Sequence, residues 1–526
     1  MAGKCKLESA FDGNQVPVYE RDGQKKHLGS RYDGKYMANK WLEYHVDDHT
    51  ENLLLFGIGD GQIVRAALEY VPGNIVVFEP SGEIYQAVKK TEIFKKITGV
   101  SRVHFFYGSS GFREAEHKIR RILNEDCVEV TMLAVHPGYA GMYPEELSRL
   151  HDICEKICGE IAFMKKPIQR FIHAMIHNQL TNIPHIKGGI PIARLRKYWK
   201  PDVPVIMVSA GPSLNKNAGW LENAKGKAFI FCVDAALPAL LEKGIVPDLV
   251  ACTDAMKNMN CFEDQRSFEI PLLVTTNSPC ELLEKSSAVK IWGDDHAFVQ
   301  MLFGEIGIEL PRIPFYSGVA TALFASILEL GTKEIIMVGQ DLAYSEDGKS
   351  HITGRDEGFV KDENFKAEGY YGGEVWSRGD WISFLNWFEK MISHFPACTV
   401  TNCTEGGVKI RGTKQKPLKE VLANLPCKGS EMSQILENRN IYMSDSEYSR
   451  LISEYCKCRS DLKIIREQGY ERTFFQEDYR SIPVMRLVID CMKSMEDSDR
   501  RTRFEKSVAW ISEELEKTDQ INTLIG

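Results

Sequence analysis

The segment VIMVSAGPSL, at residues 205–214, has the pattern of a strand that ends in a short glycine loop. Its apolar run stops at Ser209, and Gly211, Pro212 and Ser213 follow before a helical pattern begins. Glycine lets another group approach the backbone closely, and a serine hydroxyl can donate or accept a hydrogen bond. Such a loop is either a plain tight turn or the cradle of a phosphate, and the segment alone does not decide between the two.

Polar residues also end the apolar strands that follow this loop. The carboxyl ends of parallel strands line one crevice of an α/β sheet, and ligands bind there. A single aspartate at a strand end is more often a helix cap or a turn former, but a series at successive strand ends predicts a binding site. The series comprises Asp234, Asp254, Thr275, Thr276, Asn277, Gly339, Gln340 and Asp341.

The stretch FYSGVATALFASILELG, at residues 315–331, predicts an anion-binding helix start. Ser317 and Gly318 open a long apolar helix and place a hydroxyl and backbone N–H groups at its positive end, which suits a phosphate. The alternative is that Ser317 only caps the helix. The G-x4-G-K-[ST] pattern is absent here, which disfavours a P-loop kinase or NTPase.

Apolar periodicity predicts three regions that position these residues and indicates the α/β class. Residues 1–165 place the strand patterns NLLLF and NIVVF around a helical pattern, as in a Rossmann-like parallel sheet. Residues 166–425 alternate near-continuous apolar strands with helices, which predicts a second parallel sheet covered on both faces. Residues 426–526 are amphipathic and poor in glycine, which predicts a C-terminal helical bundle.

The first region has its own glycine loop, GIGDG at residues 57–61, with Glu79 at the end of the next strand. This resembles the first half of a methyltransferase or dinucleotide site, in which the acid holds a ribose hydroxyl. The later strand ends read FFYGSS and LAVHPG, without the acidic groups such a site usually has. We therefore favour a structural role for this loop; a methyltransferase is the alternative, which S-adenosylmethionine binding would test.

The composition narrows the classes of function. The formal net charge of -8 argues against a general nucleic-acid binder, because such proteins need a basic face. We see no apolar targeting segment at the N-terminus, and no run approaches the about 18 apolar residues of a spanning helix. Fourteen scattered cysteines without zinc-ribbon spacing fit reduced thiols. We expect a cytoplasmic protein without membrane insertion; the sequence leaves a homo-oligomer open.

The segments VSAGPSL, FYSGVATALFASILELGTKEIIMVGQDLAYSEDGKSH and TEGG (residues 404–407) together resemble the bacterial motility-associated factors, which are flagellin glycosyltransferases. More distantly, GPSL and the segment around GQD are similar to bacterial sialyltransferases that use CMP-sialic acid. The resemblance is densest over residues 165–425, and the order of the three regions extends it to nearly the whole chain. It implies a central, sialyltransferase-like glycosyltransferase domain.

The resemblance implies transfer of a nonulosonic acid, such as pseudaminic or legionaminic acid, from its CMP-activated form to Ser/Thr of flagellin, as flagellum assembly and motility require. Gly211, Pro212, Ser213, Ser317 and Gly318 would then contact the CMP donor. Asp234 stands where the sialyltransferases usually have Asn, so its own role is open. The further donor-binding candidates are Asp254, Asn277 and Gln340.

The chemistry needs a general base, because the acceptor hydroxyl is a poor nucleophile until its proton is removed. His351 follows GQDLAYSEDGKS and is the candidate, since a histidine pKa near neutrality suits this transfer. Asp341 and Tyr344 are supporting catalytic candidates. Arg378 or Lys349 would pair with the sugar carboxylate. No tightly bound cofactor and no divalent metal are expected.

Two other functions remain open at this point. The archaeal hydroxymethylpterin pyrophosphokinases have a related core and would use ATP and Mg²⁺, with Asp234 and Asp254 on the metal, although their chains are much shorter. A flagellin-binding protein whose glycosyltransferase core has decayed is the non-enzymatic alternative.

Overall fold

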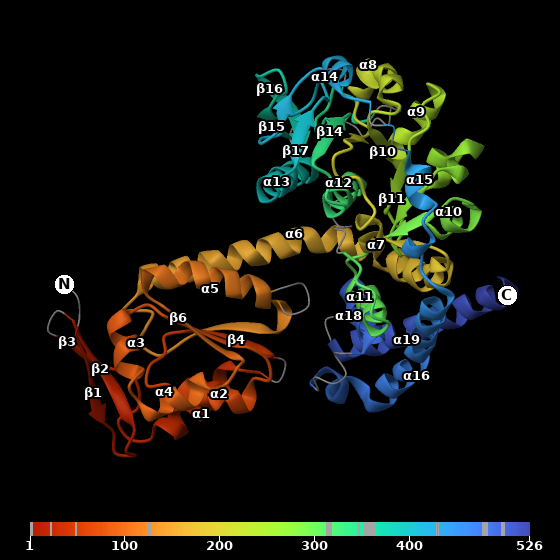
Figure 1. Cartoon of the computed structure of the whole chain (residues 1–526). Coiled ribbons are helices and arrows are strands. Elements are labelled where there is room, and N and C mark those ends of the chain that lie inside the picture. Colours follow the sequence, from red (N-terminus) through yellow and green to blue (C-terminus); the bar gives the residue numbers. More distant parts are fainter. Residues whose placement is uncertain are drawn as a thin grey trace. The chain divides into compact units, whose positions relative to one another are not determined.

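A computed structural model describes residues 4–525 except 22–23, 48–49, 124–127, 312–317, 346–347, 352–363, 428, 430, 476–481 and 496–499. The chain forms two compact units, Met1–Gln169 and Arg170–Gly526 (Figure 1). The strands that follow residue 170 and the C-terminal helices therefore belong to the same unit. The two boundaries given above, at residues 165 and 425, remain a prediction.

The first unit is built on a four-stranded parallel sheet with the strand order β6-β5-β4-β7. Every residue of β4 and β5 is buried, because helices cover both faces of the sheet. The sheet strands are β4 (Asn52–Phe56), β5 (Ile75–Glu79), β6 (Val103–Tyr107) and β7 (Thr131–Val135). The helices are α1 (Gly34–His45), α2 (Gln62–Tyr70), α3 (Gly82–Val88), α4 (Glu92–Thr98) and α5 (Gly108–Ile122).

A small antiparallel sheet precedes this core, and a long helix follows it. The antiparallel strands are β1 (Lys4–Ser9), β2 (Gln15–Arg21) and β3 (Gln24–His27). Helix α6 (Pro144–Asn182) then carries the chain into the second unit.

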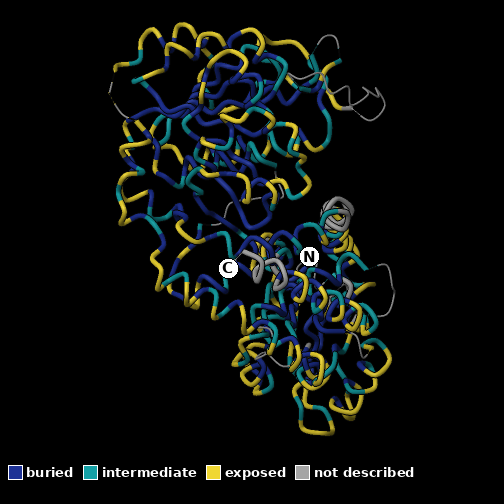
Figure 2. Tube along the Cα trace, turned by 90° about the vertical axis from the view of Figure 1, so that its right-hand side faces the viewer, coloured by how far each residue is buried: buried dark blue, intermediate teal, exposed yellow. Residues whose placement is uncertain are grey.

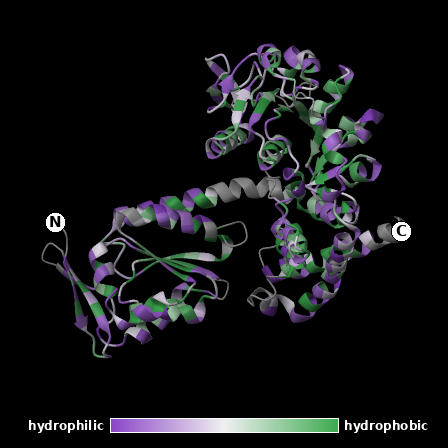
Figure 3. Ribbon diagram, in the orientation of Figure 1, coloured by the Kyte–Doolittle hydropathy of each residue, from purple (hydrophilic) through white to green (hydrophobic). Residues whose placement is uncertain are grey.

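The second unit contains a nine-stranded sheet with the order β18-β17-β14-β9-β10-β11-β12-β13-β8, in which every neighbouring pair is parallel. Its central strands are apolar at nearly every position, so they are buried on both faces; Figures 2 and 3 show them as buried and hydrophobic. The strands are β8 (Ile190–Pro191), β9 (Val205–Val208), β10 (Phe229–Val233), β11 (Leu249–Cys252), β12 (Leu272–Val274), β13 (Lys290–Trp292), β14 (Glu334–Val338), β17 (Thr399–Asn402) and β18 (Lys414–Gln415).

Helices connect these strands, and a short antiparallel pair, β15 (Asn364–Glu368) and β16 (Glu374–Arg378), lies in the segment after β14. The connecting helices are α7 (Ile192–Arg196), α8 (Leu214–Asn217), α9 (Leu237–Glu242), α10 (Cys280–Lys285), α11 (Ala297–Glu305), α12 (Val319–Glu329) and α13 (Gly379–His394); α14 (Leu418–Asn424) and α15 (Met432–Leu436) follow β18.

The C-terminal helices are α16 (Asp445–Phe475), α18 (Pro483–Ser494) and α19 (Arg500–Ile525). They contact one another, and α16 and α18 also contact α11 of the sheet region, so the helical segment shares its core with the second unit. The predicted α/β class with parallel sheets and C-terminal helices is confirmed. None of the described helices is long and apolar enough to cross a membrane.

The strand order of the large sheet reverses beside β9. From β9 the chain adds β10, β11, β12 and β13 on one side, and β14 then pairs with the other side of β9. Connections that leave two such strands diverge, which opens a crevice at their carboxyl ends. The loops after β9 and β14 therefore form the walls of any ligand site here.

Candidate active site

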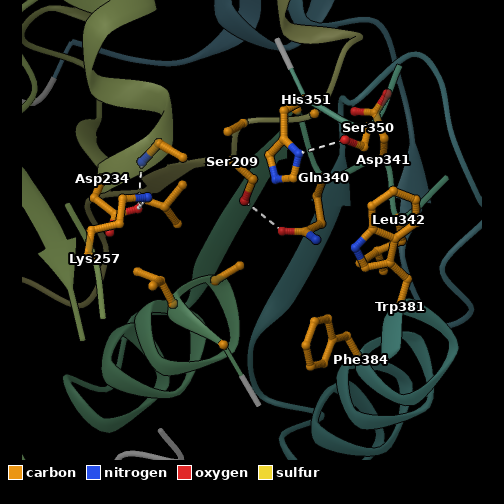
Figure 4. Close-up of a pocket in the computed structure, with 18 residues that line it drawn as sticks. Ser209, Asp234, Lys257, Gln340, Asp341, Leu342, Ser350, His351, Trp381 and Phe384 are labelled. Atoms are coloured by element: carbon orange, nitrogen blue, oxygen red, sulfur yellow. Dashed lines mark hydrogen bonds and ion pairs between the residues drawn. The ribbon is translucent and has the colours of Figure 1, made fainter. Parts of the chain in front are cut away.

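A cavity of about 220 Å³ lies at this switch point, at the carboxyl ends of β9, β10 and β14 and at the start of α12 (Figure 4). It combines polar and charged groups on one side with aromatic rings on the other. Its lining residues are Ser209, Ala210, Gly211, Val233, Asp234, Ala235, Lys257, Gly318, Val319, Ala320, Gly339, Gln340, Asp341, Leu342, Ser350, His351, Trp381 and Phe384.

Two glycines let the loops after β9 and β14 touch. The N–H of Gly211 donates to the carbonyl of Gly339 at 2.8 Å. Gly339 has a φ of +68°, and a Cβ there would lie 2.2 Å from the carbonyl oxygen of Ser209. A Cβ on Gly211 would lie 2.1 Å from Oδ1 of Asp341. Both positions therefore require glycine, and the loop of VIMVSAGPSL is held against its partner loop by backbone contact.

Asp341 joins the same two loops through its carboxylate. Ser213 donates its backbone N–H to Oδ2 at 3.0 Å and its hydroxyl to Oδ1 at 2.6 Å. Burial raises the pKa of Asp341 to about 6, and the two bonds from Ser213 oppose that rise. Asp341 is thus buried in the cavity wall with both oxygens occupied by the loop.

The TEGG segment supports this wall from behind. A Cβ on Gly407 would lie 2.1 Å from the carbonyl oxygen of Asp341, and the N–H of Val408 donates to that oxygen at 2.8 Å. The hydroxyl of Thr404 accepts a hydrogen bond from the N–H of Gln340 at 3.2 Å. None of the four TEGG residues lines the cavity, so the segment shapes the loop after β14.

A buried ion pair forms the wall at the β10 side. Lys257 Nζ lies 3.0 Å from Asp234 Oδ1, and the side chains are 13% and 2% exposed. The N–H of Ala235 donates to the same oxygen at 2.6 Å. Burial raises the pKa of Asp234, and Lys257 opposes that rise. Burial alone would lower the pKa of Lys257, but Asp234 outweighs it and the pKa lies above its usual value. The lysine is therefore cationic at neutral pH.

The middle of the cavity carries neutral hydrogen-bonding groups. Ser209 donates its hydroxyl to Oε1 of Gln340 at 2.6 Å, which turns the Nε2 of the amide the other way (Figure 4). His351 extends over this pair, and its Nδ1 lies 3.0 Å from the hydroxyl of the buried Ser350. The cavity thus places an amide, a hydroxyl and an imidazole side by side.

Aromatic rings close the opposite side. Trp381 and Phe384 on α13 line the cavity, and Figure 4 draws them away from the Asp234–Lys257 pair. Behind Trp381, Tyr344 packs with a centroid separation of 4.9 Å, and the Arg378 guanidinium lies 4.2 Å from the Trp381 ring centroid. Such flat apolar walls suit a sugar ring or a base.

Of the site residues predicted from the sequence, seven line the cavity: Gly211, Asp234, Gly318, Gly339, Gln340, Asp341 and His351. Pro212 and Ser213 lie in the adjoining loop and do not line it. Ser317 lies outside the described residues.

Five other predicted residues do not line the cavity. Asp254 is exposed and its Oδ1 accepts the N–H of Met256 at 2.9 Å, as a turn former does. Asn277 is fully buried, and its Oδ1 accepts from Gln179 of α6 at 2.9 Å. Tyr344, Lys349 and Arg378 do not line the cavity; Arg378 is paired with Asp380 at 2.9 Å.

The sequence interpretation did not include five polar or aromatic lining residues among its site residues: Ser209, Lys257, Ser350, Trp381 and Phe384. Ser209 could have been found as the first polar residue after the apolar run of β9. Lys257 was harder to find from the sequence, because its only indication is that it lies three residues after Asp254. The turn of the chain, which the sequence pattern does not show, places it beside Asp234.

The glycine loop of the first unit is filled by the chain's own side chains. A Cβ on Gly57 would lie 2.5 Å from the ring of Tyr139, and one on Gly59 would lie 2.0 Å from Nε2 of His136. Tyr139 donates its hydroxyl to Glu79 Oε2 at 2.8 Å and accepts from the N–H of Gly59 at 3.2 Å. Rings thus occupy the space beside the loop, which supports the structural role.

The described residues contain no group of three or more His, Cys, Asp or Glu side chains arranged to hold a metal ion. Asp234 and Asp341 both line the cavity, but one is paired with Lys257 and the other with Ser213.

Comparison with known proteins adds two findings. A family model described as "6-hydroxymethylpterin diphosphokinase MptE-like" matches residues 177–347, which include β9 to β14. The fold is similar to that of the Maf glycosyltransferase from Magnetospirillum magneticum AMB-1, with a TM-score of 0.53 and 16% identity, covering 99% of this chain and 91% of that one. No curated protein matches the sequence. The expected resemblance to the motility-associated factors is confirmed as a likeness of fold over nearly the whole chain.

Proposed function

We propose that this chain is a glycosyltransferase that transfers a nonulosonic acid, of the pseudaminic or legionaminic type, from its CMP-activated form to Ser/Thr of flagellin. The cavity at the switch point is the observation that supports the proposal. Two glycine-containing loops, the imidazole of His351 and the rings of Trp381 and Phe384 surround one space of about 220 Å³. The likeness of fold to a Maf glycosyltransferase supports the same reaction class. We place the enzyme in the cytoplasm, where CMP-sugars are made.

In this proposal His351 is the general base. With Nδ1–H donating to Ser350, Nε2 keeps the lone pair that takes the proton of the acceptor hydroxyl. The acceptor oxygen forms a bond to the anomeric carbon while the bond from that carbon to the phosphate oxygen breaks, and CMP leaves as the phosphate anion. A single displacement of this kind inverts the configuration at the anomeric carbon.

The glycine loops and Gln340 would hold the nucleotide. Gly211 and Gly339 hold the two loops in close contact, and both line the cavity, so their backbone would border a bound ribose or phosphate. The Nε2 of Gln340, oriented by Ser209, would donate to an acceptor atom of the nucleotide. Trp381 and Phe384 would face the sugar. Lys349 or Arg378 remain our candidates for the sugar carboxylate, although Arg378 must first leave Asp380.

The family-model match favours a second candidate, a pyrophosphoryl transfer from ATP with Mg²⁺. That reaction would need Asp234 and Asp254 as metal ligands. Asp234 is instead paired with Lys257, and Asp254 is exposed and bonded to Met256. The side-chain arrangement therefore supports the CMP-sugar enzyme over the ATP–Mg²⁺ enzyme.

Ligand-induced stabilisation separates the two candidates, because a ligand that binds only the native state raises the unfolding temperature. We expect CMP in EDTA to raise it, and ATP with Mg²⁺ to leave it unchanged. A shift with ATP–Mg²⁺ and none with CMP would reject the glycosyltransferase in favour of the kinase.

A further inference from the structure

The loop after β11 turns back toward the cavity, and its Lys257 lines the cavity wall. Asp254 accepts the N–H of Met256 on its carboxylate at 2.9 Å and the N–H of Lys257 on its carbonyl at 3.2 Å, so the chain turns back on itself. Lys257 then reaches Asp234 at 3.0 Å, and both residues line the cavity. Asp254 thus shapes the turn that positions Lys257.

Lys257 is the group with a permanent positive charge among the residues that line the described cavity. The lining also includes the carboxyl groups of Asp234 and Asp341. Asp234 and Lys257 offset each other's charge and Asp341 adds a negative one, so Lys257 is the cationic donor that this lining offers to a phosphate. The carboxylate of Asp234 is 2% exposed and holds the ammonium from the protein side. The remaining N–H groups of the ammonium are the donors that a ligand can use.

The start of α12 adds a second positive element to the same cavity. Gly318 caps this 11-residue helix without a side chain, and Val319 and Ala320 line the cavity with it. First-turn N–H groups and the positive end of the helix dipole attract anions. Lys257 and the start of α12 therefore face one space from two elements of the fold.

We propose that Lys257 binds the phosphate of the nucleotide donor, opposite the start of α12, and that Asp234 is the positioning residue that keeps its ammonium in the cavity wall. The inference rests on the proposed function and adds the residue that carries the phosphate. It also predicts that the phosphate binds without a divalent cation.

The test measures dissociation constants by calorimetry, in EDTA, for CMP, cytidine, AMP and adenosine. The quantity of interest is the preference for a nucleotide over its own nucleoside, because a general loosening of the site weakens both alike. Lys257→Met alone leaves Asp234 as a buried unpaired charge that destabilises the fold. The decisive variant is therefore the double substitution Asp234→Asn/Lys257→Met, which removes both charges together.

In the wild-type protein we expect CMP to bind about 10- to 100-fold more tightly than cytidine, as charge-assisted hydrogen bonds to one phosphate would give. The double variant should lose most of this preference, because only the start of α12 remains to attract the phosphate. Asp234→Asn alone should weaken the preference without changing cytidine affinity, because the ammonium remains but is no longer held. The control is Lys285→Met, which breaks an exposed lysine–glutamate pair on α10 and should change nothing.

Three results would overturn the inference: an unchanged CMP preference in the double variant, a preference in the wild-type protein that requires added Mg²⁺, or no preference for either nucleotide in EDTA. If the wild-type protein prefers AMP over adenosine and ignores CMP, and the double variant loses that preference, the role of Lys257 stands and the proposed CMP donor is wrong.

Discussion

Ser213 gives both its backbone N–H and its hydroxyl to the carboxylate of Asp341, at 3.0 and 2.6 Å, across 128 positions of the chain. The two residues belong to the loops after β9 and β14, which diverge at the point where the strand order reverses. The pair therefore fixes the width of the cavity between those loops. Neither residue needs to touch the ligand for its loss to change the site.

Ser213→Ala should lower the free energy of unfolding of the second unit by about 1–3 kcal/mol, because the buried carboxylate of Asp341 loses a donor. Donor affinity should fall with it. Calorimetric unfolding measures the first effect and CMP titration the second. Ser393→Ala, on the exposed face of α13, is the matched control. An equal loss of stability and of CMP affinity in both variants would argue against this role of the Ser213–Asp341 pair.

Gly339→Ala should destabilise the second unit by more than about 2 kcal/mol. The left-handed backbone costs an alanine about 1–2 kcal/mol, and its Cβ would also lie 2.2 Å from the carbonyl oxygen of Ser209. Gly304→Ala in α11 is the control, since no atom lies within 4 Å of its Cβ and alanine favours a helix. The comparison uses unfolding temperatures, and a Gly339 variant as stable as the Gly304 variant would refute the close approach.

His351→Gln should slow transfer by about 10²- to 10⁴-fold while leaving CMP affinity unchanged, because the imidazole acts on the acceptor proton and not on the nucleotide. His394→Gln, an exposed histidine at the end of α13, should behave like the wild-type protein. Initial rates at saturating donor, together with CMP titrations, give both quantities. A His351 variant with full activity would remove this residue from the mechanism.

Glu79 should make the first unit less stable as the pH rises, while the buried His136, whose pKa burial lowers to about 4, contributes in the opposite direction. Burial raises the pKa of Glu79 to about 7, and its hydrogen bonds from Ile58, Ser81 and Tyr139 only partly oppose this. The folded state therefore binds more protons than the unfolded state between about pH 4.5 and 7. The stabilising contribution is complete below pH 4.5 and is lost as the pH passes 7.

Glu79→Gln should make this loss smaller, although Asp60, whose pKa burial also raises to about 6, keeps part of it. The measurement is the change in unfolding free energy of the first unit from pH 5 to pH 8, and the variant should lose about 1–3 kcal/mol less than the wild-type protein. The glutamine also changes the unfolding free energy by fitting the site less well than the glutamic acid. This effect does not depend on pH, so it cancels when the two pH values are compared. An identical loss in the two proteins would mean that Glu79 does not titrate in this range.

Sequence patterns located the loops of the site but not their neighbours in space. Gly211, Gln340 and Asp341 were predictable because each lies two or three residues after the end of an apolar strand. Asp254 and Asn277 follow strands in the same way, yet they do not line the cavity. The difference comes from strand order: the reversal lies between β9 and β14, and local periodicity does not encode which strands are neighbours.

Residues that contact a loop from a distant part of the sequence were harder to predict. Lys257 reaches the cavity only because the turn at Asp254 sends it back to Asp234, and a lysine in a polar loop normally lies in solvent. In the first unit, the glycine loop had the pattern of a cofactor site, and the filling of its space by Tyr139 and His136 depends on a loop more than 70 residues later.

The intact mass of flagellin after incubation with this protein and a CMP-activated nonulosonic acid tests the central proposal most directly. We predict one or more added masses, each equal to the sugar residue, with release of CMP and with no addition when the His351→Gln variant replaces the wild-type protein. Flagellin of unchanged mass with both pseudaminic and legionaminic donors, under conditions in which CMP binds, would contradict the account.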